Sequence, residues 1–261
     1  MLPTIVVGPV SLRMPGLALI VGVWIALEIA SRLAQHQDFS EDQLFSAGFC
    51  LHVARLAGAR LGFVLLNLDL YTSITPLSRA VLAAFALSSG TENIWFGLVA
   101  GGAFFWWFAQ QNELAPLRLA DALVPAVLMM GIAVGFANFF SGDYYGVFTT
   151  LPWGIDLWGG VRHPTQIYFL LACVILLGGL IWLLLTDRAQ GWPPGTISQL
   201  CLLGLGVAWL LIEPLRADSP VFGDGWRIWQ MIGLTAIVVS LLGFAWRAPS
   251  QAQNVQPAEQ P

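Results

Sequence analysis

The sequence predicts an all-α, polytopic membrane protein with about seven transmembrane helices and a small interfacial helix and loop region on one side. Two observations support this prediction. The chain is 57% hydrophobic and only 10% charged, with a mean hydropathy of +0.74, whereas soluble domains carry about 25% charged residues. Apolar runs of roughly 18 or more residues, long enough to cross a bilayer, recur along the chain. A soluble enzyme with a large core is therefore strongly disfavoured.

The expected spans have recognisable boundaries. Pro164 stands at the first turn of the clearest span, where its missing N–H is tolerated. The next span ends where Glu213 meets Pro214, and Pro125 predicts a kink inside the fourth. The seven expected spans are Gly16 to Leu33, Leu44 to Leu66, Trp95 to Gln110, Leu119 to Phe140, Pro164 to Thr186, Thr196 to Ile212 and Ile228 to Trp246.

The third expected span, Trp95 to Gln110, is the shortest. Its Gly97, Gly101 and Gly102 allow a neighbouring helix to approach closely. Before it, Arg79 to Ser88 is expected to form a short amphipathic helix in the membrane interface. This helix and the loops around it make up the interfacial region of the predicted fold.

The chain is interpreted as one transmembrane domain, residues 1–247, followed by a tail. Residues 248–261 are rich in Pro, Gln and Ala and are expected to be disordered. Seven spans place the two termini on opposite sides of the membrane. The distribution of arginines over the loops does not decide which side is which.

Charge and cysteine content narrow the classes of partner. The net charge is −4 and no basic patch is present, so nucleic acid is not an expected partner. Cys50, Cys173 and Cys201 each lie in an apolar run, and their number is odd. We interpret them as small core residues and not as a disulfide or metal framework.

Polar chemistry concentrates between Asn138 and Tyr168, with long apolar runs on both sides. Arg162, His163 and Pro164 place a cation and a titratable imidazole at the start of a helix, a position that favours anions. The alternative is that the arginine contacts lipid headgroups while the imidazole makes a local hydrogen bond. Spacing alone leaves both interpretations open.

Three further groups are ambiguous in the same way. Asn138 and Asp143 belong to a functional loop or to a simple turn. Glu213 and Arg216, three residues apart, form a local ion pair or orient the arginine towards a phosphate. Arg60 lies in an apolar run, and a charge at membrane depth needs a partner. Arg60 therefore either belongs to the site or forms a structural ion pair.

Five pieces of the chain, in register, resemble the prolipoprotein diacylglyceryl transferase family. Arg162 to Tyr168 is similar to the family's Arg-His-Pro-Ser-Gln-Leu-Tyr-Glu signature, and Leu151 to Ile155 to a stretch just upstream of it. Val134 to Gly146 lies over the pattern G-R-x-G-N-F-x-N-x-E-x-x-G. Gly58 to Phe63 resembles Gly-Gly-Arg-Ile-Gly-Tyr, and Ile212 to Arg216 resembles a late Glu-Phe-Phe-Arg piece.

The resemblance implies a seven-helix transferase of the bacterial inner membrane with its N-terminus on the outer side. Such a protein moves the diacylglyceryl group of phosphatidylglycerol to the lipobox cysteine of a preprolipoprotein, and needs no metal or organic cofactor. It implies catalytic roles for His163, Asp143 and Glu213. The residues implied to bind the lipid phosphate and headgroup are Arg60, Asn138, Arg162, Gln166, Tyr168 and Arg216.

Several positions depart from the family pattern. The stretch Ile94 to Leu98 lacks the histidine of the family's His-Gly-Gly motif. Gly135 and Trp209 stand where the family has functional arginines. Ser141 replaces an asparagine, and Phe169 replaces a glutamate. Losing one anion-stabilising group typically lowers a rate by about 100- to 1000-fold, so these departures bear directly on activity.

Two hypotheses follow. In the first, the protein is a working transferase with a rearranged site, in which Arg60, Arg162 and Arg216 bind the phosphate and His163 assists the thiol. In the second, it is a non-catalytic relative that acts as a lipid-binding scaffold or as a subunit of a larger membrane complex. A transporter or channel is less well supported, because the sequence shows no pair of broken-helix repeats.

Overall fold

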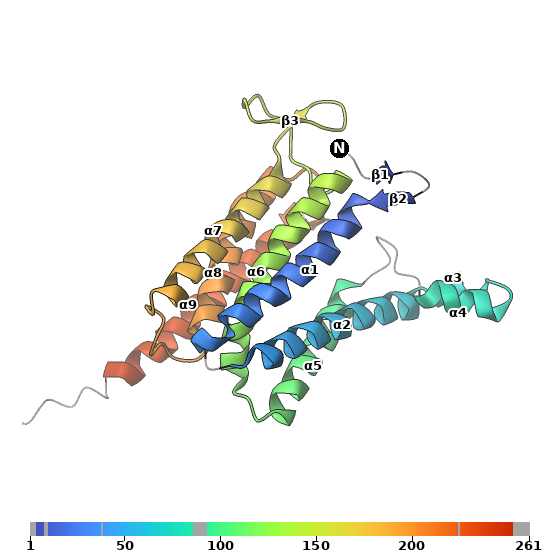
Figure 1. Ribbon diagram of the computed structural model, residues 1–261. Helices are drawn as coiled ribbons and strands as arrows, with labels where there is room; N and C mark the ends of the chain where they lie inside the picture. Colours follow the sequence, from blue (N-terminus) through green and yellow to red (C-terminus); the bar gives the residue numbers. More distant parts are fainter. Residues whose placement is uncertain (1–3, 8–9, 38, 86–92, 224, 253–261) are drawn as a thin grey trace, which may run out of the picture. The chain divides into compact units, whose positions relative to one another are not determined.

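Figure 1 shows the computed structural model of the chain, which describes residues 4–7, 10–37, 39–85, 93–223 and 225–252. Helices make up most of the described residues. They are α1 (Met14–Leu33), η1 (Ala34–Gln37), α2 (Glu41–Leu66), α3 (Leu68–Thr72), α4 (Leu77–Phe85), α5 (Ile94–Gln111), α6 (Pro116–Ser141), α7 (Thr165–Leu185), α8 (Thr196–Ile212), η2 (Glu213–Leu215) and α9 (Ile228–Ala252).

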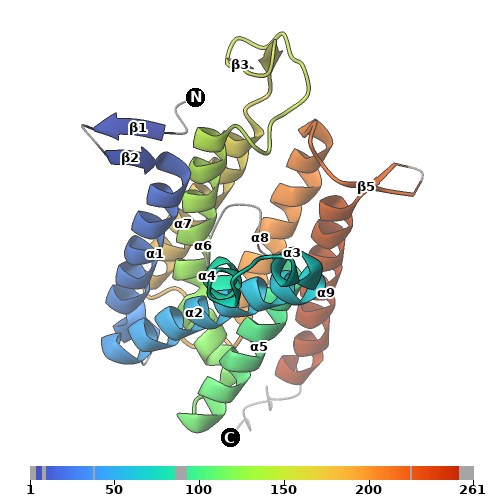
Figure 2. The ribbon, with the colours of Figure 1, turned by 90° about the vertical axis from the view of Figure 1, so that its right-hand side faces the viewer.

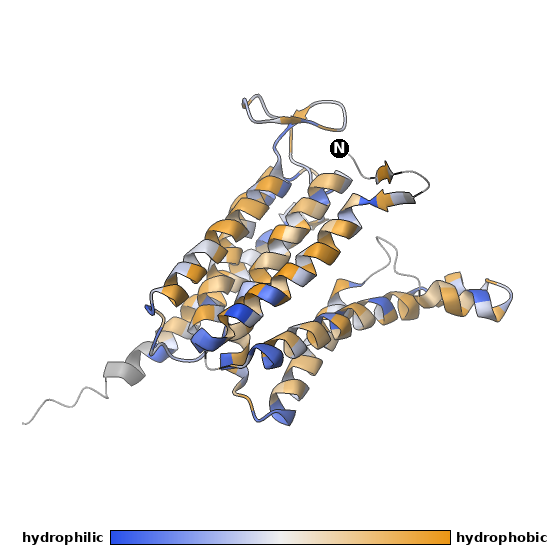
Figure 3. Cartoon of the chain, in the orientation of Figure 1, coloured by the Kyte–Doolittle hydropathy of each residue, from blue (hydrophilic) through white to orange (hydrophobic). Residues whose placement is uncertain are grey.

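Among the described residues, six helices are long and apolar enough to cross a membrane, namely α1 with η1, α2, α6, α7, α8 with η2 and α9. This confirms the polytopic, helical fold class. The third expected span is also a helix, α5, which has 18 residues, ends in two glutamines and is not among these six. In Figure 3 hydrophobic residues cover most of the length of these helices.

Helix boundaries agree closely with the sequence. The prediction of Thr196 to Ile212 for α8 is confirmed at both ends, and α7 begins directly after Pro164. α2 begins three residues before the expected Leu44, because Ser40 caps it. The Ser40 hydroxyl accepts a hydrogen bond from the Gln43 N–H (3.2 Å), and the Gln43 side chain accepts one from the Ser40 N–H (3.1 Å). This reciprocal capping box pairs two N–H groups that the helix leaves open.

Two compact units make up the chain, residues 1–30 with 123–261 and residues 31–122. In the first unit small residues allow close helix packing. A Cβ added to Gly22 of α1 would lie 2.1 Å from the Cβ of Ala133 in α6. Gly206 of α8 and Gly233 of α9 each approach the other's carbonyl oxygen, at 2.8 Å from an added Cβ. Figures 1 and 2 show α8 and α9 side by side.

In the second unit α2 packs along α5. A Cβ added to Gly58 would lie 2.2 Å from the Cβ of Ala100, and one added to Gly97 would lie 3.0 Å from the Cβ of Ala59. The expected glycine contact is therefore confirmed for Gly97. Gly102, by contrast, has open space around it. The expected interfacial helix corresponds to α4, and its last expected residues, 86–88, lie outside the described residues.

Short strands were not predicted. Three two-stranded antiparallel hairpins occur in the described residues, all in the first unit. Figure 2 shows the third hairpin beside the ends of α8 and α9. The helix α9 continues past the point where a disordered tail was expected to begin. The strands are β1 (Thr4–Val7), β2 (Val10–Arg13), β3 (Ile155–Asp156), β4 (Val161–Arg162), β5 (Val221–Phe222) and β6 (Trp226–Arg227).

Candidate functional site

The site is built around a short ladder of backbone hydrogen bonds in the first unit. Residues 145–149, which follow α6, lie between two other segments. On one side Val147 N donates to Leu215 O at 2.8 Å. On the other side Gly146 N donates to His163 O at 3.1 Å, and His163 N donates to Val147 O at 3.0 Å. The ladder therefore joins segments that follow α6, precede α7 and follow α8.

Gly146 lies where two backbones come into contact. A Cβ at this position would lie 2.4 Å from the His163 carbonyl oxygen and 2.5 Å from the His163 Cβ. On its other side Gly146 is bridged to Arg216, and one step along the ladder Phe148 is bridged to Arg162. The ladder thus places Arg162 and Arg216 on opposite sides of one central segment.

Tyr144, just before the ladder, has a left-handed backbone with φ = 57°. Such a conformation costs a non-glycine residue about 1–3 kcal/mol unless its surroundings hold it. Here the Tyr144 N–H donates to Asp218 Oδ2 at 2.6 Å, and the Thr165 hydroxyl donates to the Tyr144 carbonyl. Beside it Gln166 Nε2 donates to the Asp143 carbonyl at 2.7 Å. Three side chains therefore fix the path of this loop.

A buried ion cluster lies beneath this loop. Arg216 Nη1 contacts both oxygens of the Glu213 carboxylate at 3.1 and 3.0 Å. Its Nε and Nη2 donate to Asp218 Oδ1 at 3.1 and 2.9 Å. The Ser219 hydroxyl also donates to Glu213, and Arg227 Nη1 donates to the carbonyl oxygens of Glu213 (3.0 Å) and Arg216 (2.6 Å). All three nitrogens of Arg216 are therefore engaged within the protein.

The ring of Tyr144 covers this cluster, with the Arg216 guanidinium 3.9 Å from the ring centroid. Burial raises the pKa of the Tyr144 hydroxyl, and the nearby carboxylates of Asp218 and Glu213 raise it further, against an opposing effect of Arg216. The phenol is therefore neutral at physiological pH, and it presents its ring face to a cation, an arrangement that stabilises both.

Arg162 has a different environment. Its Nε donates to Leu157 O at 2.9 Å and its Nη1 to Gly146 O at 3.2 Å. The guanidinium carbon lies 3.9 Å from the ring centroid of Phe148 and 5.1 Å from that of Tyr145. Among the described residues, Nη2 makes no hydrogen bond, and no carboxylate pairs with this half-buried cation. Arg162 can therefore still bind an anion.

His163 is held by a chain of side-chain hydrogen bonds. Its Nδ1 lies 3.1 Å from the Tyr168 hydroxyl, and Trp153 Nε1 donates to that hydroxyl at 2.8 Å. A phenol oxygen can accept two hydrogen bonds. If His163 Nδ1–H is the second donor, Nε2 carries a lone pair and is able to take a proton. Pro164 follows His163 directly and starts α7.

Most of the site residues predicted from the sequence lie on the ladder or on the segments next to it. Asn138 lies in the last turn of α6, where its carbonyl accepts from Gly142 N at 2.9 Å, and Asp143 is exposed on the loop. Arg60 belongs to the second unit. There its Nε and Nη2 donate to the carbonyls of Ala84 (2.8 Å) and Ala83 (2.6 Å), near the C-terminus of α4. Its role in the site stays a prediction.

Sequence reasoning missed the residues that hold the site together. Asp218 is the most important of them, since it contacts both Tyr144 N–H and Arg216. Its position two residues after Arg216 was a signal available in the sequence. Trp153 was noted only as part of a resembling stretch, and its link to Tyr168 was not foreseeable, because the two are 15 residues apart across a hairpin.

Three of the departures from the family pattern, at Gly135, Phe169 and Trp209, take part in two packing contacts. At Gly135 an added Cβ would lie 2.8 Å from the Cβ of Leu170, so α6 and α7 are too close there for a long side chain. The rings of Phe169 and Trp209 are stacked, 6.4 Å apart at 7°. Trp229 joins them, 5.9 Å from Trp209. Aromatic packing thus occupies two positions where the resemblance leads one to expect an acid and a base.

The fold and the site define a class of protein. It is a polytopic helical membrane protein in which a loop between two spans carries an arginine with free donors for an anion, Arg162, and an imidazole, His163. Within the described residues no group of three or more His, Cys, Asp or Glu side chains is placed to hold a metal ion. The family model described as prolipoprotein diacylglyceryl transferase matches residues 3–246. The chain belongs to the prolipoprotein diacylglyceryl transferase family.

Curated relatives agree with this assignment. The phosphatidylglycerol-prolipoprotein diacylglyceryl transferase of Synechococcus elongatus is 30% identical over 94% of this chain and 86% of the relative. That of Aliivibrio fischeri is 30% identical over 98% of this chain and 91% of the relative. That of Vibrio parahaemolyticus is 30% identical over 92% and 88% respectively.

Proposed function

We propose that this protein transfers the diacylglyceryl group of phosphatidylglycerol to the cysteine thiol of a prolipoprotein in the bacterial inner membrane. The single observation that carries the proposal is the state of Arg162, a half-buried cation that keeps Nη2 unbonded among the described residues and directly precedes His163 in the chain. Whole-chain similarity to transferases with these substrates in their names supports it.

The reaction needs one bond to form and one to break. The thiol loses its proton, its sulfur attacks the terminal glyceryl carbon that bears the phosphate ester, and the C–O bond breaks. A thioether forms, and glycerol phosphate leaves with the electron pair. His163 Nε2 takes the thiol proton, and Tyr168 and Trp153 orient the ring through Nδ1.

The leaving phosphate needs a fixed cation. Arg162 Nη2 supplies donors that the loop does not use, and charge-assisted hydrogen bonds to phosphate are about twice as strong as neutral ones. Arg216, with Glu213 and Asp218, then acts by holding the loop, because its nitrogens are already bonded. In this proposal Arg162 binds the substrate, and Arg216 positions the loop that carries it.

A direct assay tests the proposal. The purified protein, in nanodiscs containing phosphatidylglycerol, is incubated with a lipobox peptide, and mass spectrometry detects the diacylglyceryl mass on the cysteine. We expect the adduct with the wild type, a loss of about 100-fold or more with His163→Gln, as is typical of a lost general base, and no adduct with a serine peptide. The Synechococcus elongatus relative serves as the positive control. If the positive control forms the adduct and this protein does not, the transferase proposal is overturned.

The second candidate function is a non-catalytic lipid-binding scaffold, alone or within a larger membrane complex. The stack of Phe169, Trp209 and Trp229 favours it, since an apolar cluster contributes nothing to a developing phosphate charge. In the same assay this candidate predicts phosphatidylglycerol binding without adduct. It also predicts co-purification of a partner at fixed stoichiometry, which an independently acting enzyme does not require.

A further inference from the structure

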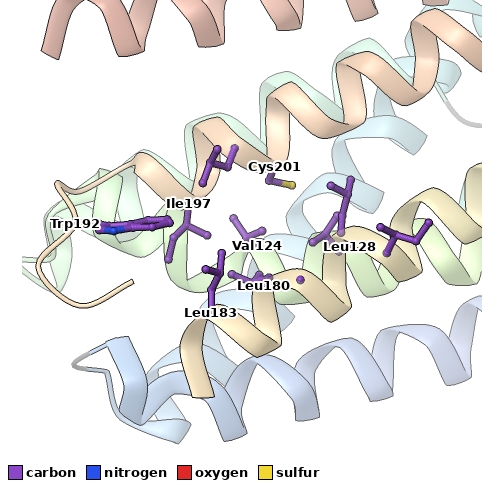
Figure 4. A pocket seen from close by; sticks show the side chains of 11 residues that line it. Val124, Leu128, Leu180, Leu183, Trp192, Ile197 and Cys201 are labelled. Atoms are coloured by element: carbon purple, nitrogen blue, oxygen red, sulfur yellow. The ribbon is translucent and has the colours of Figure 1, made fainter. Parts of the chain in front are cut away.

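A separate apolar cavity lies at the other end of α7. Its volume is about 240 Å³, and α6, α7, α8 and the segment before α8 line it. Figure 4 shows Leu183 of α7 and Ile197 of α8 pointing into the same space beside Trp192. All its lining side chains are aliphatic or aromatic except for the Cys201 thiol. Pockets for drug-sized molecules begin at about 300 Å³. This smaller cavity has room for part of one hydrocarbon chain.

The cavity opens on the outer face of α7. Two of the lining residues on α7, Ile175 and Gly179, are exposed. A Cβ at Gly179 would meet nothing within 4 Å, so the glycine leaves an open gap in the cavity wall. The neighbouring Gly178 is exposed in the same way but does not line the cavity. This open gap therefore lies on a helix that is long and apolar enough to cross a membrane.

Cations lie where the cavity ends. The guanidinium carbon of Arg188 lies 4.6 Å from the ring centroid of Trp182, which precedes the lining residue Leu183 in α7. Arg247 Nη1 lies 3.4 Å from the hydroxyl of Thr196, next to the lining residue Ile197. Trp192 is itself part of the wall. An aromatic residue and basic residues at the end of an apolar segment are typical of the lipid headgroup level.

We propose that this cavity binds one acyl chain of an anionic phospholipid whose headgroup lies between Arg188 and Arg247. Arg188 lies beyond the C-terminal end of α7, whose 21 residues extend about 30 Å from Thr165 at 1.5 Å per residue. A lipid whose headgroup lies there is therefore not the one whose headgroup is held at the candidate transfer site. It binds α6, α7 and α8 together at the end of the unit remote from the ladder. The proposal does not depend on catalytic activity.

A photoreactive lipid tests the location. Nanodiscs are prepared with a phosphatidylserine that carries a diazirine on one acyl chain, because phosphatidylserine is not the proposed transfer substrate. We expect labelling of Ile175, Leu176 and Leu200, mapped by peptide mass spectrometry. Gly179→Phe fills the gap, and we expect it to lower this labelling at least tenfold. Gly178→Phe, with the same bulk on the same helix, leaves the labelling unchanged.

Two results would overturn the proposal. One is labelling that is equal in Gly179→Phe and Gly178→Phe while both variants unfold at the wild-type temperature. The other is labelling spread evenly over all spans. The headgroup is tested by Arg188→Gln, which should weaken retention of phosphatidylserine about fivefold, with no effect on a phosphatidylcholine probe. Equal effects on the two lipids reject the anionic headgroup.

Discussion

The two arginines on either side of the ladder differ in what surrounds them. Arg216 is 6% exposed, and two carboxylates engage all its nitrogens. Arg162 is half-buried, contacts carbonyls and aromatic rings, and keeps Nη2 available. A buried, fully bonded arginine stabilises one backbone arrangement. A cation with open donors can exchange partners, as a substrate phosphate requires. The two arginines thus define a structural half of the site, around Arg216, and a binding half, around Arg162.

The largest effect is expected from breaking the buried half. Glu213→Gln leaves Arg216 with a single carboxylate in a buried site, and breaking such a pair costs about 3–5 kcal/mol. Thermal unfolding in detergent measures this loss. Glu113→Gln, which removes an exposed carboxylate, is the matched control and should leave the midpoint unchanged. Equal midpoints for the two variants would show that the cluster adds no stability.

Gly146→Ala changes the central segment of the ladder, which lies between Arg216 on one side and His163 on the other. The new Cβ would lie 2.4 Å from the His163 carbonyl oxygen, so the central segment must move away from its neighbour. We expect about 1–3 kcal/mol of destabilisation and loss of phosphatidylglycerol binding. Gly178→Ala, whose Cβ meets nothing within 4 Å, is the control in the same measurement. A stable, lipid-binding Gly146→Ala protein would contradict the ladder geometry.

Asp218→Asn removes a carboxylate charge that accepts hydrogen bonds from both the Tyr144 N–H and the Arg216 guanidinium. We expect a loss of about 1.5 kcal/mol, typical of a hydrogen bond to a charged group. A double-mutant cycle with Tyr144→Gly measures the coupling, because glycine adopts the left-handed backbone without help. If Asp218 holds that backbone, its substitution costs less in the glycine background. Strict additivity argues against the positioning role.

Arg162→Gln should change stability little, by about 1 kcal/mol, since its contacts within the described part of the chain are to carbonyls and rings. Its effect should instead appear in binding. Phosphatidylglycerol raises the unfolding midpoint of the wild type by mass action, and we expect this rise to disappear in the variant. A variant that retains the full lipid-dependent rise would exclude Arg162 from phosphate binding.

The smallest effect concerns Tyr144 at alkaline pH. Because its pKa is raised in the folded protein, the unfolded chain loses this proton first, at about pH 10. Its contribution to stability is complete below that pH and is lost as the pH rises through the folded value. Tyr144 is 38% exposed, so solvent screens much of the effect. Comparing the midpoints of wild type and Tyr144→Phe between pH 8 and pH 11 measures it.

Helices were predictable because periodicity, capping and length act locally. Thr196 to Ile212 was predicted at both ends, and the proximity of Glu213 to Arg216 follows from a spacing of three residues. The ladder was not predictable, since residues 145–149 carry no alternating pattern and pair with segments far along the chain. The sequence indicated which residues are polar and near a span end, and left open which partner each one has.

The aromatic stack illustrates the same limit. Phe169 and Trp209 were each noted as departures, and nothing in either position indicates that their rings meet 6.4 Å apart. Contact between α7 and α8 brings them together, and helix contacts depend on the whole packing surface. Two departures that look unrelated in the sequence therefore form one contact in the structure. A test that restores the family residues at Phe169 and Trp209 should change both positions together.

The ladder also has a consequence for biosynthesis. Val147 donates to Leu215, a residue the ribosome adds roughly 70 positions later, which takes several seconds at about 5–20 residues per second. Until α8 has been inserted, the middle segment has a bonding partner on one edge only. A nascent chain halted after α7 therefore presents an open backbone edge at the membrane surface, and the insertion machinery or water must satisfy those groups during synthesis.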